Sequence, residues 1–221
     1  MSLAIVYSRA SMGVQAPLVT IEVHLSNGKP GFTLVGLPEK TVKEAQDRVR
    51  SALMNAQFKY PAKRITVNLA PADLPKEGGR FDLPIAIGIL AASDQLDGSR
   101  LKQFEFVGEL ALTGELRGAH GVIPAILAAQ KAKRAPIIAY QNANEASLVS
   151  EQETYFAKNL LEVVQFLNNQ EKVRRYVRAI FRLVWEWFLH LLRQGVRHYD
   201  VALEKDVVSS YENLIHFVLN S

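Results

Sequence analysis

Apolar and polar residues alternate from Arg64 to Leu69, and this period of two predicts a half-buried strand that ends at Pro71. A charged loop with two glycines follows. The apolar run over residues 83–92 then predicts a helix, with Asp82 as its N-cap. A loop between the end of a strand and the start of a helix commonly presents a nucleophile or binds an anion. Residues 71–92 nevertheless contain no Ser, Thr, Cys or His, so this segment offers no nucleophile.

The same patterns predict the elements that precede this segment. Short strands are expected over residues 3–7, 19–25 and 32–35, joined most simply as an antiparallel meander. Apolar residues at three- and four-residue steps predict an amphipathic helix from Pro38 to about Phe58. Its solvated face carries two expected i, i+4 ion pairs, Glu44 with Arg48 and Lys43 with Asp47.

After residue 92, strands and helices alternate. The expected elements are a strand over 104–112, a turn at 113–115, a helix over 125–133, a strand over 135–140, a short helix over 143–149, a strand over 155–157 and a helix over 160–167. An initial run of strands followed by this alternation indicates a two-layer α/β domain that covers residues 1–170.

The remaining residues, 171–221, differ in composition. They hold both tryptophans, and eight basic against five acidic residues from Lys172 onward. An apolar stripe beside a row of arginines predicts a mostly helical tail. Three roles stay open for it: packing on the first domain, packing on another copy of the chain, or contact with a membrane surface or nucleic acid.

Composition narrows the class of protein. The chain has 221 residues, a formal net charge of +4 and no cysteine, which excludes disulfides and thiolate metal sites. Its five histidines are scattered without metal-ligand spacing, so no metal site is expected. We find neither a secretory signal pattern nor a long charge-free apolar window. We therefore expect a cytoplasmic protein that does not insert into a membrane.

Common nucleotide and hydrolase motifs are also missing. The nearest approach to a P-loop is the segment 36–41, in which Glu39 stands where a glycine is required. No dinucleotide glycine fingerprint, Gly-x-Ser-x-Gly elbow or zincin helix occurs. The chain is therefore not expected to bind ATP itself.

Several runs together resemble one family. They are Gly36-Leu-Pro-Glu-Lys-Thr-Val-Lys-Glu-Ala, Pro61-Ala-Lys-Arg-Ile-Thr-Val-Asn-Leu-Ala-Pro-Ala-Asp-Leu, Lys76-Glu-Gly-Gly-Arg-Phe-Asp-Leu-Pro-Ile-Ala and Val107-Gly-Glu-Leu. Over residues 1–170 the chain resembles the amino-terminal domain of the magnesium chelatase-related competence protein family (ComM/YifB). The resemblance implies a Lon protease-like, ribosomal protein S5 domain 2-like fold, followed in that family by an AAA+ module.

The family's full-length proteins are implied to be hexameric helicases that move branched DNA during natural transformation. ATP and Mg²⁺ would belong to the AAA+ module, which residues 171–221 do not resemble. The partners implied for this chain are its own AAA+ module, other subunits of a hexameric ring, and DNA.

Lon-like proteases use a Ser-Lys dyad, in which the lysine serves as general base for the serine. The resemblance places Asp82 at the serine position and Ile123 at the lysine position. Because these side chains cannot perform nucleophilic amide cleavage together, we predict a non-catalytic interaction or assembly domain. A peptidase with a dyad displaced to Ser93 and Lys131 is an alternative, as is a chelatase-like regulatory module, although no residue indicates magnesium or porphyrin binding.

Two interpretations remain open for the charged loop. In the structural one, Gly78 and Gly79 provide turn geometry while Asp82 caps the helix. In the functional one, four cations gather near one rim and contact DNA phosphate or a neighbouring subunit. Those cations are Lys63, Arg64, Lys76 and Arg80.

Overall fold

The first sheet has four strands in the order β1 (Leu3–Arg9), β2 (Leu18–Ser26), β4 (Arg64–Ala70) and β3 (Gly31–Val35). The computed structural model describes residues 2–36, 44–76, 78–149 and 153–168. β2 runs antiparallel to both β1 and β4, whereas β3 runs parallel to β4. The expected meander is therefore wrong at its third strand. Helix α2 (Ala45–Asn55) lies between β3 and β4 in the chain, and such a crossover returns the chain in the parallel direction.

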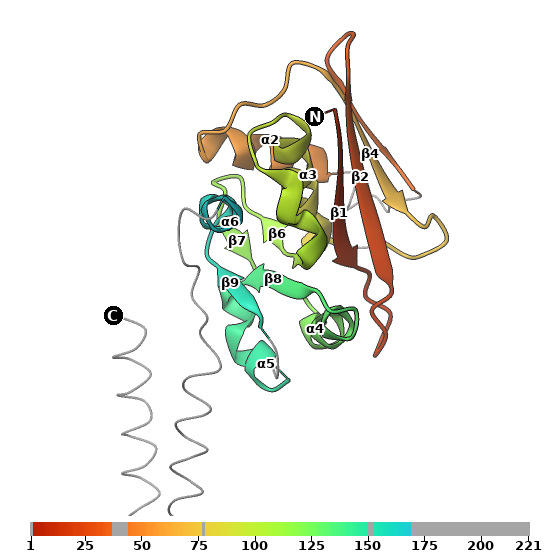
Figure 1. Cartoon of the computed structure of the whole chain (residues 1–221), viewed down its shortest axis with the longest axis vertical. Coiled ribbons are helices and arrows are strands. Elements are labelled where there is room, and N and C mark those ends of the chain that lie inside the picture. Colours follow the sequence, from red (N-terminus) through yellow and green to blue (C-terminus); the bar gives the residue numbers. More distant parts are fainter. Residues whose placement is uncertain (1, 37–43, 77, 150–152, 169–221) are drawn as a thin grey trace, which may run out of the picture. The chain divides into compact units, whose positions relative to one another are not determined.

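One face of this sheet is apolar and covered by helices. Val6, Ile21 and Val67 alternate with more exposed neighbours and are fully buried, as the period of two predicted. Helices α2 and α3 (Asp82–Ala92) lie against this face, while the opposite face is open (Figure 1).

Helix α3 lies at the centre of the fold, and all eleven of its residues are buried. Gly88 permits its close approach to the sheet, because a Cβ atom there would lie 2.5 Å from Cγ2 of Val23. The predicted helix is confirmed, but the predicted N-cap is wrong. Phe81 is the N-cap residue, and Asp82 is already helical with its carboxylate bonded elsewhere.

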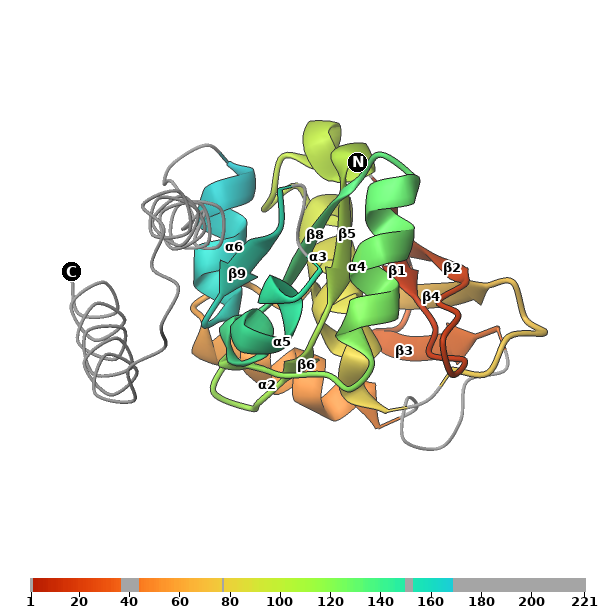
Figure 2. The same cartoon turned by 90° about the horizontal axis from the view of Figure 1, so that it is seen from below.

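A second sheet packs on the other side of α3. Its strands β5 (Phe104–Val107), β8 (Ala135–Ala139) and β9 (Tyr155–Ala157) are all parallel. Phe106, Ile137 and Tyr155 join the core around α3. Val107, Ile138 and Phe156 point to the other face, into a smaller core with α4 (Val122–Lys131) and α5 (Ala143–Ser147). Because this sheet is buried on both faces, the two-layer prediction is incomplete (Figure 2).

The predicted strand over 104–112 is divided at Gly108 into β5 and β6 (Glu109–Leu110). The N–H of Gly108 donates to the carbonyl of Arg80, and the carbonyl of Gly108 accepts from the N–H of Leu83. These two hydrogen bonds hold Gly108 next to the start of α3. β6 then pairs with β7 (Leu116–Arg117) across the expected turn, where Gly114 has a φ of +88°.

Helix α6 (Leu160–Leu167) matches its prediction, and the short 3₁₀ helices span Gly79–Phe81, Gly98–Gln103 and Tyr140–Asn142.

A buried ion cluster joins the two sheets. Glu105 on β5 accepts hydrogen bonds from Arg9 of β1 at 2.6 and 2.7 Å and from Arg134 at 3.1 Å. The Arg134 guanidinium also stacks 4.2 Å from the ring centroid of Tyr7. A buried carboxylate requires such partners, and here two guanidinium groups supply them.

Two predictions lie outside the described residues. These are the helical tail over 171–221 and the first part of the helix expected from Pro38, of which α2 forms the remainder. Among the described helices, none has the length and apolar character needed to cross a bilayer.

Candidate functional site

Asp82 occupies a buried position where three elements meet. Its carboxylate accepts two hydrogen bonds from Arg48 of α2, at 2.7 Å from Nε and 3.0 Å from Nη2. The N–H of Leu110 on β6 donates a third bond at 3.3 Å. Both carboxylate oxygens are therefore engaged, and the bidentate geometry holds the side chain in one orientation.

This arrangement corrects the expected role of Arg48. The i, i+4 pattern predicted that Arg48 pairs with Glu44 on a solvated face of α2. In the structure Arg48 turns toward the start of α3 and forms a bidentate ion pair with Asp82, while Glu44 acts on it only through its charge. A buried carboxylate gains more from a bidentate partner than an exposed glutamate does, because water screens the exposed pair.

Burial raises the pKa of Asp82 to about 6, although the hydrogen bonds from Arg48 act in the opposite direction. Hydrogen bonding to Asp82 in turn raises the pKa of Arg48. Both oxygens of the Asp82 carboxylate are therefore held by hydrogen bonds, and the Arg48 guanidinium contains no oxygen.

The start of α4 lies beside this centre. Nη1 of Arg80, in the loop before α3, donates a weak 3.4 Å hydrogen bond to the carbonyl of His120, just before α4. Ile123 is half-buried in the first turn of that helix. This bond places the loop before α3 next to the residue that precedes α4. The assignment of Asp82 and Ile123 to the positions of a catalytic hydroxyl and amine remains a prediction from the resemblance.

Lys76 and Arg80 are both buried. The Lys76 ammonium donates hydrogen bonds to the carbonyls of Pro71 and Leu74, the latter at 2.9 Å. Lys76 therefore stabilises the loop that follows β4, to which it belongs. Burial lowers the pKa of Lys76, and it lowers the pKa of Arg80 to about 10. Within the described part of the chain, Nε and Nη2 of Arg80 have no hydrogen-bond partner.

Lys63 and Arg64 are exposed and lie at the opposite end of β4 from Lys76 and Arg80. A seven-residue strand is about 20 Å long. The structure therefore does not gather the four cations at one rim as expected. The contact of any of them with DNA or with another subunit remains a prediction.

The residues of the alternative displaced dyad lie at the far ends of their helices. Ser93 follows the last residue of α3, and its hydroxyl donates to the carbonyl of Ile89 at 2.8 Å. Lys131 is the last residue of α4 and is exposed. An eleven-residue helix separates Ser93 from Asp82 by roughly 16 Å, so Ser93 is remote from the loop that would present a nucleophile.

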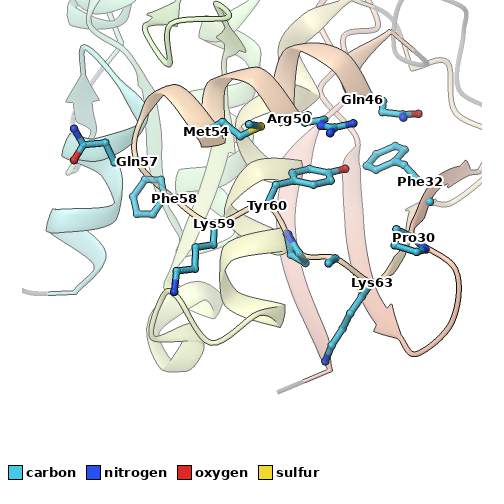
Figure 3. Close-up of a pocket in the computed structure, with 13 residues that line it drawn as sticks. Pro30, Phe32, Gln46, Arg50, Met54, Gln57, Phe58, Lys59, Tyr60 and Lys63 are labelled. Carbon is cyan, nitrogen blue, oxygen red and sulfur yellow. The ribbon is translucent and has the colours of Figure 1, made fainter.

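A second candidate site is an open groove of about 900 Å³, which we call the α2 groove. Figure 3 shows it between the exposed side of α2, the loop over 58–63 and the start of β3. Three aromatic rings and three cations are among its lining residues, namely Phe32, Phe58, Tyr60, Arg50, Lys59 and Lys63. Sequence reasoning identified only Lys63 of these. The interleaved aromatic and basic residues of Phe58-Lys-Tyr-Pro-Ala-Lys were the signal that could have indicated the groove.

Metal binding has no candidate among the described residues, where no three His, Cys, Asp or Glu side chains come together. The structure thus offers two candidate functional sites. One is Asp82 with its partners Arg48 and Leu110, which we call the Asp82 centre, and the other is the α2 groove.

Comparison with known proteins identifies the relatives of this chain. A family model described as subunit ChlI of Mg-chelatase matches residues 21–142, more than half of the chain. The chain belongs to the ChlI family. Within it, the competence protein ComM of Haemophilus influenzae is 91% identical over 173 residues, which are 78% of this chain and 34% of that protein. The YifB protein of Salmonella typhimurium is 58% identical over 175 residues, 79% of this chain and 35% of that protein.

The Lon protease of Leptospira interrogans is a more distant relative of this ChlI-family chain. It is 28% identical over 171 residues, which are 73% of this chain and 20% of the protease. The chain spans about one third of the length of the ComM and YifB relatives. The expected kinship with ComM and YifB is confirmed.

Proposed function

We propose that this chain is a non-catalytic Lon-like interaction domain of an AAA+ DNA-processing protein. In this proposal it has the ribosomal protein S5 domain 2-like fold and acts in the cytoplasm. Its partners are an AAA+ module and neighbouring subunits of a hexameric ring, which moves branched DNA during natural transformation. ATP and Mg²⁺ bind the AAA+ module and not this chain.

The observation that carries the proposal is the state of the Asp82 centre. The resemblance assigns Asp82 to the position of the Lon serine and the aliphatic Ile123 to that of the lysine. The clamping of the Asp82 carboxylate by Arg48 supports a structural role for this position. Peptide hydrolysis by such a site needs a hydroxyl and a base within hydrogen-bond reach of each other. The distant similarity to a Lon protease supports a fold that this chain shares with Lon-like proteases. The name of the ComM relative supports a role in competence.

A fluorophosphonate probe tests the catalytic half of the proposal. We expect no covalent labelling of the 221-residue chain and no turnover of unfolded casein. Labelling that is lost in Ser93→Ala, together with hydrolysis lost in Lys131→Gln, would replace the proposal by the displaced-dyad peptidase.

Co-expression tests the assembly half. The chain is produced together with the remaining two thirds of the Haemophilus influenzae ComM relative as a separate polypeptide. We expect the two to co-purify as one complex in size-exclusion chromatography with light scattering. Two separate peaks at micromolar concentration would remove the assembly role.

A further inference from the structure

We infer that the α2 groove binds single-stranded nucleic acid, with bases stacked on its aromatic rings and phosphates held by its cations. The groove is separate from the Asp82 centre, and the inference rests on the proposed function only in its DNA-processing part. Loss of nucleic-acid binding would leave the non-catalytic assembly role unchanged, because the two are measured separately.

The rings of the groove are fixed platforms. Phe32, Phe58 and Tyr60 are partly buried and pack with one side against the main hydrophobic core. Their remaining surface faces the groove (Figure 3). An aromatic face that is already ordered loses little conformational entropy when a base stacks on it.

A cation is held over one of these rings. The Arg50 guanidinium lies 5.4 Å from the centroid of the Tyr60 ring, and both side chains line the groove (Figure 3). This cation–π contact keeps the guanidinium next to the platform. A guanidinium in that place can pair with a phosphate while the neighbouring base stacks.

The charge of the groove fits a polyanion. Arg50, Lys59 and Lys63 line it, and no acidic side chain is among its lining residues in the described structure. Lys29 and Arg64 are also exposed, and each lies next in the chain to a lining residue. Asp47, on the same helix, contributes through its charge to raising the pKa of Tyr60, but it does not line the groove.

The combination of rings and cations favours a single strand over other anionic partners. In a duplex the base faces are stacked on each other and cannot reach Phe32 or Tyr60, whereas an unpaired strand exposes them. An acidic peptide would pair with the cations but has no planar group for each ring. The cations can pair with phosphates but do not distinguish one base from another. We therefore expect binding that is strong at low salt and independent of the nucleotide sequence.

Fluorescence anisotropy of the 221-residue chain with labelled 20-nucleotide oligomers tests the inference. Parallel titrations with oligo(dT) and oligo(rU) compare DNA with RNA. A DNA duplex and a poly-glutamate peptide serve as competitors. We expect both single strands to bind more tightly than the duplex, and poly-glutamate to compete only weakly.

Four variants assign the binding to the groove. Tyr60→Leu keeps apolar packing but removes the ring, and we expect about tenfold weaker binding, whereas Tyr60→Phe binds as the unmodified chain does. Arg50→Gln should reduce the slope of log K against log salt by about 0.7, the loss of one phosphate contact on a single strand. Lys102→Gln removes an exposed cation outside the groove and is the matched control.

Photocrosslinking locates the strand independently of the basic tail. An oligomer that carries 5-iododeoxyuridine is irradiated with the full chain, and the adducts are mapped by mass spectrometry. Adducts on Tyr60 or Phe32 support the inference. Adducts confined to residues outside the groove, equal binding by Tyr60→Leu, or full competition by poly-glutamate would overturn it.

Discussion

One carboxylate, Asp82, ties together the three elements that surround it. It belongs to α3, accepts both bonds of the Arg48 fork from α2, and accepts the Leu110 N–H from β6. The sequence indicated only that an acidic residue begins a helix. That position predicts a cap, but burial demands a charged partner, and only the packing of α2 onto α3 supplies one.

Loss of this carboxylate should destabilise the fold. Asp82→Ala removes the bidentate carboxylate partner of the partly buried Arg48 guanidinium, and we expect the free energy of unfolding to fall by about 3 kcal/mol. Urea unfolding followed by circular dichroism measures it. Glu44→Ala, at the exposed start of α2, is the control and should change stability by less than about 0.5 kcal/mol. A loss below about 1 kcal/mol in Asp82→Ala would show that the pair is not a structural clamp.

The pKa of Asp82 also predicts a pH dependence. Burial raises the pKa from 3.8 to about 6, so between these values the folded state binds more protons than the unfolded state. The part of the unfolding free energy that comes from this proton uptake is therefore present in full below about pH 4 and is lost as the pH rises through about 6. It is separate from the pairing with Arg48 that Asp82→Ala removes. The difference in unfolding free energy between the unmodified chain and Asp82→Asn should fall over this range and then level off. A difference that rises with pH would contradict the raised pKa.

At the scale of elements, local patterns predicted which segments are regular but not how they pair. Alternation predicted β4, and three- and four-residue steps predicted α2. The strands β1 and β2 and the helix α6 were also predicted from the sequence. The pairing of β3 with β4 instead of β2 depends on the crossover through α2, which no single segment encodes. The division of the 104–112 strand at Gly108 likewise depends on hydrogen bonds to the loop before α3.

A close contact between elements, α3 against β2, can be tested at Gly88. Gly88→Ala improves helix propensity but drives a methyl group into Val23, which is β-branched and buried, so we expect a net loss of about 1–3 kcal/mol. Thermal melting measures the loss. Gly98→Ala, where the nearest atoms are 3.7 Å away, should be nearly neutral. The double variant Gly88→Ala/Val23→Ala should be less destabilised than the two single changes predict, and strict additivity would show that the contact is loose.

At the scale of the whole molecule, the described residues form two hydrophobic clusters. The main hydrophobic cluster extends from Ala4 to Leu167, and the smaller one covers the second sheet. The buried Glu105 cluster then ties the two sheets together. We therefore expect the α/β domain to fold without residues 169–221.

A truncated chain tests this independence. We expect residues 1–168 to unfold in one cooperative transition, because every member of both clusters is retained. A chain of residues 1–158 is the matched control. It lacks α6, whose Leu160, Val163 and Leu167 are buried, and should lose cooperative unfolding. Urea titration with two optical probes distinguishes the cases, and a non-cooperative 1–168 chain would refute the prediction.

The sequence by itself determined the α/β class, most helices and strands, the family, and the absence of Ser, Thr, Cys and His from residues 71–92. These properties depend on residue identity and on periodicity within a segment. Tertiary structure alone decided that Arg48 clamps Asp82, that Lys76 and Arg80 are buried far from Lys63, and that Arg50, Tyr60 and Phe32 share a groove. Such relations arise when segments distant in the chain pack together, because burial and charge pairing are properties of the packed interior and not of any local pattern.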